Sequence, residues 1–292
     1  MYLIYLCHQN EASGLFSASP FCFPRVDMSF CYESMCSSSN ISINSVVDIS
    51  QDAIRRVIHA FNRHKFIVIT LENPNPSPKA ELHALSHFFG APCLHERSDE
   101  NGIVTIAPKH SESSYLSAST MEHRLHTDGS FDSVPPKVSA ILCVHPSTCG
   151  GGETLLLQAK DVYQNILAYQ TAILPMLYQS DAMKITRKER QAVHPIFREE
   201  NGRIQIIYRC DSSSKIEVAH YAKDAFKSLS SMIKQIPPYR FTLQKNQLLV
   251  MDNTAVLHGR TSFALTGERL LYRLNMNGIS PYRHQLTFGF LK

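Results

Sequence analysis

From Gly90 onward the chain consists of short apolar runs separated by turn residues, and this pattern constrains its fold more than any other feature. Runs of this length predict β-strands, and many short strands in succession favour a β-sandwich or barrel. We find no internal repeat and no second hydrophobic unit with its own linker, so one domain is expected. The predicted strands are 103–107, 138–144, 154–158, 204–208, 247–251 and 270–276.

Apolar residues recur at helical spacing in two segments that precede these strands, 51–64 and 79–89. Ser50 is suited to cap the first of these helices. A continuous apolar run between them, 66–71, predicts another strand. The fold class expected from this order is mainly β with flanking helices. Helical spacing also occurs in two segments within the strand-rich part, 159–168 and 218–233.

Residues 1–44 differ from the rest, because they are rich in Ser, Cys and Phe without a clear period. We predict a poorly ordered or peripheral N-terminal extension there, and a single domain over residues 45–292. The apolar start lacks the basic leader and the long apolar core of a signal peptide. No apolar run approaches the roughly 20 residues of a membrane span. A cytoplasmic protein without a membrane partner is therefore expected.

The charged residues and the cysteines exclude some classes of function. The net charge of +4 is small, and no cluster of Lys and Arg indicates nucleic-acid binding. Although there are eight cysteines, none form a Cys-x-x-Cys pair, so a structural zinc site is not expected. Reduced thiols are the expectation for a chain without an export signal.

His126 and Asp128 are the first candidate metal ligands. They lie two residues apart on a segment that we expect to be extended, so their side chains project to the same side. Such a pair is weak evidence alone, because the chain has 14 His. His258, which follows a predicted strand, adds a third ligand. Two histidines and one carboxylate on one face form the facial triad typical of non-haem Fe(II) oxygenases, which leaves coordination positions open.

Two arginines, Arg269 and Arg273, follow His258 in the sequence. A 2-oxo acid needs two of the open positions on such an ion, and O2 needs the third. Its distant carboxylate is best held by a bidentate cation, which Arg supplies and Lys does not. The alternative is that Arg269 only forms a surface ion pair with Glu268, which would contribute little stability.

Several motifs together resemble the Fe(II)/2-oxoglutarate-dependent oxygenases of the taurine dioxygenase and clavaminate synthase-like superfamily. The resemblance runs from about residue 50 to 278 and leaves residues 1–44 outside. It implies a double-stranded β-helix, or jelly roll, which agrees with the strand count. The motifs, in matching order and spacing, are His126-Thr127-Asp128, Gly150-Gly151-Gly152-Glu153-Thr154, Asp252-Asn253, His258-Gly259-Arg260-Thr261 and Gly267-Glu268-Arg269.

The resemblance implies a role for each matched residue. His126, Asp128 and His258 would bind Fe(II). Thr154 and Arg269 would hold the C5 carboxylate of 2-oxoglutarate, and Arg273 would lie near its C1 carboxylate or the substrate. This chain has Glu153 where taurine-type enzymes usually have Asp. The implied activity is that of a dioxygenase, which uses O2 to hydroxylate or desaturate an unactivated C–H bond and releases succinate and CO2.

The substrate implied by the resemblance is a small molecule, anionic or amino-acid-like. His95 lies near the position at which taurine-type enzymes place a substrate-binding histidine. The segment Tyr208-Arg209-Cys210-Asp211 is similar to one near the substrate pocket of clavaminate-like hydroxylases, which brings Arg209 and Asp211 toward the substrate. The sequence leaves open whether the chain forms a homo-oligomer.

Two other classes of function stay open at this point. One is a zinc-dependent hydrolase, in which a site of two histidines and one aspartate activates water. The other is a non-catalytic jelly-roll binding module, such as a sugar-binding domain. A hydrolase does not need the carboxylate clamp predicted at Arg269 and Thr154, and a binding module does not need three metal ligands.

Overall fold

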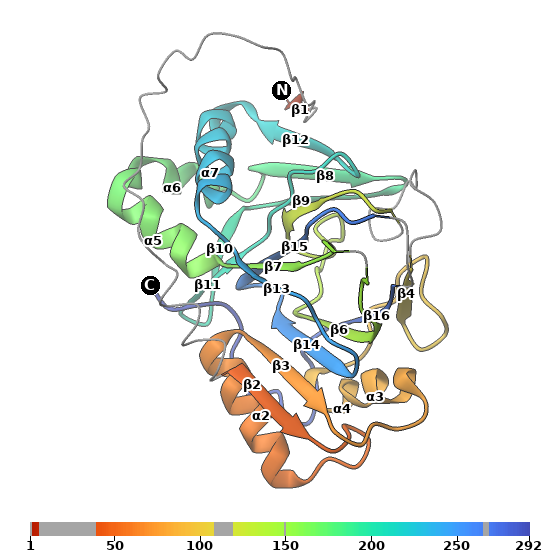
Figure 1. Cartoon of the computed structure of the whole chain (residues 1–292). Coiled ribbons are helices and arrows are strands. Elements are labelled where there is room, and N and C mark those ends of the chain that lie inside the picture. Colours follow the sequence, from red (N-terminus) through yellow and green to blue (C-terminus); the bar gives the residue numbers. More distant parts are fainter. Residues whose placement is uncertain (1, 6–38, 108–118, 149, 265–268) are drawn as a thin grey trace.

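The computed structural model describes residues 2–5, 39–107, 119–148, 150–264 and 269–292, and Figure 1 shows their arrangement. Most of the predicted N-terminal extension lies outside these residues. Strand β1 (Tyr2–Tyr5) pairs with β12 (Lys215–Ala219). Strand β2 (Asn40–Ile43) runs parallel to β3 (Phe66–Leu71) at the edge of the largest sheet. The division at residue 44 stays a prediction.

The largest sheet has six strands and is buried on both faces. Along β3, Ile67 and Ile69 pack against helices, while Phe66 and Val68 pack against a second sheet. Burial of both faces explains why the strand reads as a continuous apolar run. The strand order is β2, β3, β14 (Gln247–Asp252), β6 (Val138–His145), β16 (Leu270–Met276) and β4 (Ile103–Ile106).

The second sheet has four strands and faces the first. Phe66, Leu249 and Met251 of the large sheet meet Leu156 and Val256 of the small one in a single apolar cluster. The two sheets therefore form a layered core with the candidate ligands on the small sheet. Its strand order is β13 (Tyr239–Phe241), β7 (Thr154–Gln158), β15 (Val256–Arg260) and β5 (His123–His126).

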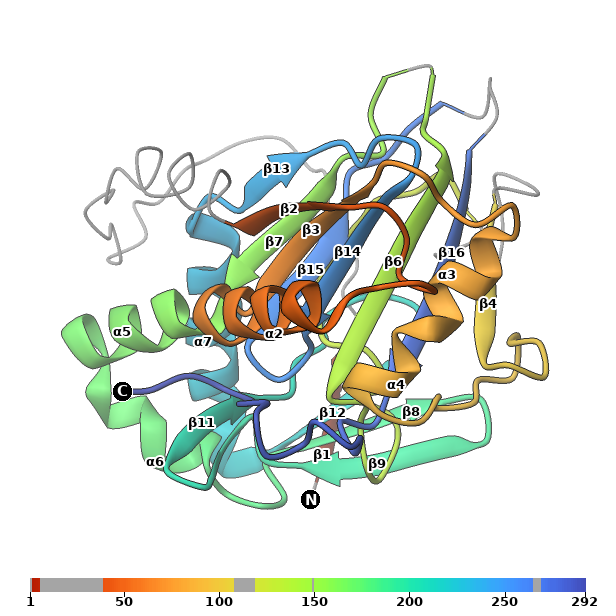
Figure 2. The same ribbon diagram turned by 90° about the horizontal axis from the view of Figure 1, so that it is seen from below.

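Three helices lie across the outer face of the large sheet (Figure 2). Helix α2 (Gln51–His64) has the predicted bounds, and the Ser50 hydroxyl caps it by accepting a hydrogen bond from the amide of Ala53. It ends at Lys65, which takes the left-handed conformation with φ 64°. The helix predicted over 79–89 is divided into α3 (Pro78–Ala84) and α4 (Ser86–Phe89).

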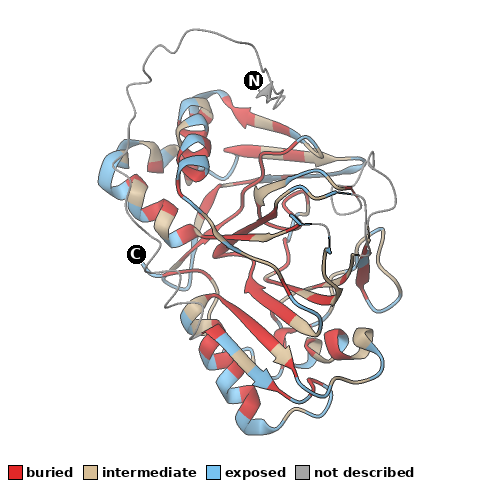
Figure 3. Cartoon of the chain, in the orientation of Figure 1, coloured by how far each residue is buried: buried red, intermediate tan, exposed pale blue. Residues whose placement is uncertain are grey.

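The remaining elements form a second layer beyond the small sheet, and Figure 3 shows their buried sides facing inward. One prediction there is wrong, because residues 218–222 do not belong to the helix predicted over 218–233. In β12, Ile216 and Val218 alternate into the core with the period of a strand, and helix α7 begins only at Lys223. The other elements are β8 (Met183–Arg187), β9 (Arg190–His194), β10 (Phe197–Glu200), β11 (Arg203–Ile206), α5 (Ala159–Tyr169), η2 (Thr171–Ile173), α6 (Leu174–Leu177), η3 (His220–Ala222) and α7 (Lys223–Gln235).

The observed architecture confirms the coarse fold class, which is mainly β with flanking helices. Within the residues that the structure describes, no helix combines the length and the apolar character needed to cross a membrane.

Candidate metal centre and its two pockets

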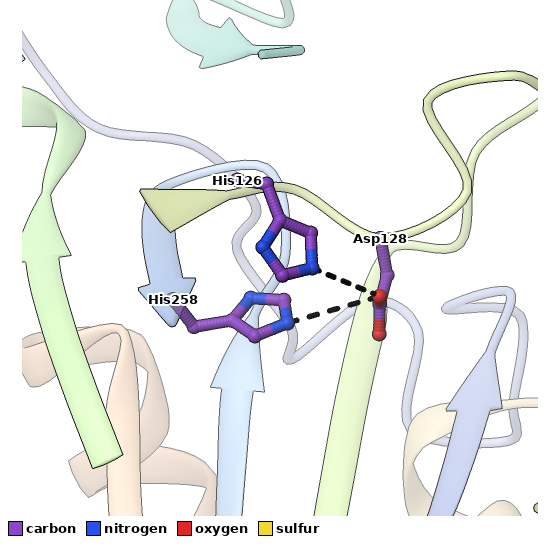
Figure 4. Close-up of side chains that lie close together, drawn as sticks. All are labelled: His126, Asp128 and His258. Atoms are coloured by element: carbon purple, nitrogen blue, oxygen red, sulfur yellow. Dashed lines mark ion pairs between the residues drawn. The ribbon is translucent and has the colours of Figure 1, made fainter. Parts of the chain in front are cut away.

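His126, Asp128 and His258 converge at the end of the small sheet (Figure 4). His126 ends β5, His258 lies at the middle of β15, and Asp128 sits in the turn after β5. Asp128 Oδ1 lies 3.6 Å from Nε2 of His126 and 3.8 Å from Nε2 of His258. All three side chains are buried. Among the described residues, this is the one group of three such side chains with the spacing of a metal site.

A β-bulge between β5 and β15 sets the direction of the ligands on β5. His258 pairs with His126, and Arg260 pairs with His123, so β5 has one more residue than β15 between the two pairs. His123 therefore faces the same side as His126, and their rings stack with centroids 3.9 Å apart. Gly259 permits this close approach, since a Cβ there would lie 2.5 Å from the carbonyl oxygen of His123.

Hydrogen bonds fix the first histidine in the form that binds a metal. His126 Nδ1 lies 2.7 Å from the carbonyl oxygen of Arg124, and an N–H donated to that carbonyl leaves the lone pair on Nε2. That Nε2 atom is buried and has no hydrogen-bond partner among the residues that the structure describes. A buried acceptor of this kind is costly unless something binds it, so it fits a metal ion.

Asp128 is held by contacts that its sequence motif did not predict. Asn253 accepts a hydrogen bond from the Asp128 amide at 2.7 Å, and its own amide group donates to the carbonyls of Asp128 and Pro136. The Ser139 hydroxyl donates to Asp128 Oδ2 at 3.1 Å. Asn253 was visible in the sequence only as part of the Asp252-Asn253 motif, and no pattern pointed to Ser139.

The electrostatics of the site favour metal binding. Burial alone would raise the pKa of Asp128, but Arg273, His258 and His126 outweigh it and hold that pKa well below its usual range. Arg273 Nη1 donates to Asp128 Oδ1 at 3.1 Å. Burial, together with the neighbouring His126, lowers the pKa of His258 to about 3. At neutral pH the carboxylate is ionised and His258 is neutral, which are the forms that bind a metal.

Two pockets meet at these ligands. The first, which we call the His258 pocket, encloses about 590 Å³ and contains both residues predicted to hold a distant carboxylate, Thr154 and Arg269. Its remaining lining is largely apolar. His123 and Arg273 line this pocket and the second one as well. Arg273 therefore lies between the two pockets.

Arg269 is half-buried, and its side chain lines the His258 pocket. Its Nη1 atom is buried and has no hydrogen-bond partner among the described residues. Burial lowers the pKa of Arg269 to about 10, so it stays charged at neutral pH. The guanidinium lies 5.0 Å from the ring of Phe263 and packs close to Gly152. Glu268, the alternative ion-pair partner, lies outside the described residues.

The second pocket, which we call the Asp128 pocket, encloses about 580 Å³ and is lined by Asp128 and a set of basic side chains. Two of the three predicted substrate residues, His95 and Arg209, line it. Asp211 is not among its lining residues in the described part of the chain, and instead accepts a 2.7 Å hydrogen bond from Arg209. Asp211 thus positions Arg209.

Two further residues of this pocket were not predicted. Arg187 lines it beside Phe131, with the guanidinium 5.3 Å from the ring. Asp132 lines it as well and forms an ion pair with Arg190. Arg187 comes from a segment that lies far from the metal motifs in sequence, whereas Asp132 follows shortly after Asp128 and no pattern singled it out.

A protein-family model supports the interpretation of this site. The model for "Taurine catabolism dioxygenase TauD, TfdA family" matches residues 30–275, which is most of the chain. The chain belongs to this family. A search of the curated proteins finds no match.

Solved structures share the fold at low sequence identity. An asparagine oxygenase in complex with Fe(II), 3-hydroxyasparagine and succinate is 14% identical, with a TM-score of 0.63, over 82% of this chain and 94% of that one. The non-haem iron oxygenase OrfP, in complex with Fe, succinate and a dihydroxy-arginine, is 14% identical with a TM-score of 0.64, over 80% and 83%. A taurine dioxygenase from Burkholderia xenovorans is 18% identical with a TM-score of 0.60, over 80% and 85%.

Family membership confirms the predicted class of enzyme, an Fe(II)- and 2-oxoglutarate-dependent dioxygenase. Neither the zinc hydrolase nor the non-catalytic binding module finds support in these comparisons. The donor set fits iron, because two imidazoles and one carboxylate face a common point.

Proposed function

We propose that His126, Asp128 and His258 hold Fe(II) between a cosubstrate pocket and a substrate pocket. The observation that carries this proposal is that the His258 pocket and the Asp128 pocket each contain a different member of the triad. In this arrangement the His258 pocket takes 2-oxoglutarate and the Asp128 pocket takes the substrate. When bound, iron with 2-oxoglutarate and O2 supplies the oxidation that hydroxylates or desaturates a C–H bond, with release of succinate and CO2.

The protein's own residues orient the cosubstrate. Arg269 donates to the C5 carboxylate at the closed end of the His258 pocket, and the Thr154 hydroxyl adds a weaker hydrogen bond. The apolar side chains around them, such as Ile141 and Leu271, exclude water from this end. A charge-assisted, bidentate contact in such surroundings fixes both the position and the direction of the cosubstrate.

Arg273 controls the charge between the two pockets. It donates to Asp128 Oδ1 and keeps this carboxylate ionised, as a metal ligand must be. Its Nε atom is buried and has no hydrogen-bond partner among the described residues. We propose that Nε serves the C1 carboxylate of 2-oxoglutarate or the bound substrate.

The substrate that fits the Asp128 pocket is a small amino-acid-like zwitterion. Arg187 offers a cation for a carboxylate, and the Asp132 carboxylate, which already pairs with Arg190, can accept a further hydrogen bond from an ammonium group. Burial lowers the pKa of His95 to about 4, so it faces the pocket as a neutral hydrogen-bonding group. Two structures of similar fold were solved with hydroxylated forms of asparagine and arginine, which supports this substrate class.

The type of β fold and the location of the protein in the cell are also proposals. We propose that the two facing sheets form a double-stranded β-helix, since they place a metal site at one end of a sandwich of antiparallel strands. A cytoplasmic location is expected from the sequence alone, and a homo-oligomer stays open.

A panel of free amino acids tests the substrate class. Each is incubated with the protein, Fe(II), ascorbate and 2-oxoglutarate, and succinate and product mass are measured. We expect one or a few to give succinate together with a product that has gained one oxygen or lost two hydrogens. Arg187→Gln should raise the KM for that substrate more than Arg283→Gln, an exposed control. Turnover only with substrates that lack an amino or a carboxylate group would refute the zwitterion.

A further inference from the structure

A third pocket lies on the reverse side of the small sheet, away from the iron ligands. It spans about 870 Å³, including space that is open to solvent, and is larger than either pocket at the metal centre. Strands β5 and β7 form one wall, and the end of helix α7 and the start of β13 form the other. We call it the Arg124 pocket; its lining residues include Arg124, Leu125, Leu155, Ile233, Ile236 and Arg240.

The pocket combines an apolar floor with a basic rim. Leu155, Ile233 and Ile236 are buried at the floor. The cations at the rim are Arg124, which is half-buried, and Lys234 and Arg240, which are exposed. Glu122 is the one acidic residue in the lining, so the rim carries an excess of positive charge.

The rim cations are not neutralised by the part of the chain that the structure describes. None of the three side chains forms an ion pair or a hydrogen bond with any residue in the described ranges. The three cations come from β5, the end of helix α7 and β13, and all of them line one pocket with an apolar floor. Strands β5 and β13 are the two edges of the small sheet. The positive charge of the rim therefore favours an anionic ligand, and the apolar floor favours a ligand whose anionic group is attached to a hydrocarbon body.

We propose that the Arg124 pocket is a second ligand site, which binds an organic anion with an apolar body. The anionic group would lie between Arg124 and Arg240, and the apolar body would cover Leu155 and Ile236. The ligand class is a carboxylate, sulfonate or phosphate attached to an aromatic or aliphatic group. This site is separate from the proposed pockets for cosubstrate and substrate, and shares none of their lining residues.

Arg124 also connects this pocket to the metal centre. Its side chain lines the pocket, while its carbonyl accepts the hydrogen bond that orients His126. Leu125, the other residue within the bulge, lines the same pocket. A ligand bound here would contact the bulge that sets the direction of the iron ligand.

Binding of 8-anilinonaphthalene-1-sulfonate tests this proposal, because the probe has an aromatic body and one sulfonate. It is titrated into the protein loaded with Fe(II) and 2-oxoglutarate under anaerobic conditions, and its fluorescence is recorded. We expect saturable binding of one equivalent. The double variant Arg124→Gln/Arg240→Gln should weaken it roughly tenfold, since two contacts with partly exposed charges are lost.

The matched control is Arg55→Gln/Arg63→Gln, which removes the same charge from exposed positions on helix α2. It should leave the Kd of the probe within about twofold, so that an effect of net charge alone is excluded. All four substitutions are at positions that are not buried, and circular dichroism verifies that the variants are folded.

Two results would overturn the proposal. One is equal weakening of probe binding in both double variants, or in neither. The other is displacement of the probe by excess 2-oxoglutarate, or its loss in Arg269→Ala, which would place it in the His258 pocket. The fluorescence of the probe is recorded without turnover. A negative binding result would therefore not contradict the proposed dioxygenase activity, and a negative activity assay would not contradict this binding site.

Discussion

Replacement of Arg269 by alanine is the sharpest test of the cosubstrate assignment. The guanidinium is already desolvated, and its Nη1 atom has no partner in the described protein. Its removal would leave the distant carboxylate of 2-oxoglutarate in a pocket lined by Ile106, Ile141 and Leu271, where Arg260 and Arg273 are the remaining arginines of the described lining. Hydrogen bonds to charged groups contribute roughly 1.5–3 kcal/mol each. Allowing for partial replacement by water, we expect a loss of about 2–4 kcal/mol.

That loss corresponds to a roughly 30- to 1000-fold rise in the KM for 2-oxoglutarate. Succinate release at varied 2-oxoglutarate concentration measures it. Arg269→Lys should recover part of the affinity, because Lys keeps the charge but not the bidentate geometry. Thr154→Ala should cost only about 1 kcal/mol, the contribution of one neutral hydrogen bond.

Arg283→Ala provides the control, because this arginine is exposed and lies outside both pockets. Its KM should stay within about twofold of that of the unaltered protein, as is usual for a surface substitution. An Arg269→Ala variant that is folded and has a KM changed by less than about threefold would refute the assignment of the His258 pocket to 2-oxoglutarate.

Four further predictions follow from the same geometry. Asn253→Ala removes three buried hydrogen bonds around the turn of Asp128 and should weaken Fe(II) binding roughly 10- to 100-fold in a metal titration. Gly259→Ala places a Cβ 2.5 Å from the His123 carbonyl oxygen, so both Tm and metal affinity should fall. The pKa of His258 is lowered from 6.5 to about 3, so neutral His258 is required for full stability of the metal-free protein. The free energy of unfolding should therefore be greatest above about pH 6.5 and should fall as the pH decreases toward 3. Urea titrations should show a smaller decrease in this free energy for His258→Asn. If Asp128 is an iron ligand, it fills the position that a halide would need, so with excess chloride the product should carry no halogen by mass spectrometry.

The sequence predicted those elements whose signals are local. Helix α2 and strand β3 have the predicted bounds, because Ser50 marks the start of the helix and the strand is apolar along its whole length. Strand β12 was assigned to a helix in part. Its buried residues, Ile216, Val218 and Ala219, give too short a pattern to define a period.

The residues of the candidate site also fall into those that the sequence predicted and those that it did not. The three candidate ligands were predicted from residue type and order, and the structure brings their side chains together. The residues that orient them were not, because their contacts depend on folding. Asn253 lies 125 positions from Asp128, and the bulge that turns His123 toward His126 depends on the pairing of two distant strands. Spacing along the chain carries no signal for either contact.

The most direct measurement for the central claim is the anaerobic visible spectrum of the protein with Fe(II) and 2-oxoglutarate. If His126, Asp128 and His258 hold iron with positions open for a bidentate 2-oxo acid, a weak charge-transfer band should appear when both are added. The band should be absent with either alone, and absent in His258→Ala. A folded, unaltered protein that binds Fe(II) but gives no band with 2-oxoglutarate would contradict the account, as would a band that persists without His258.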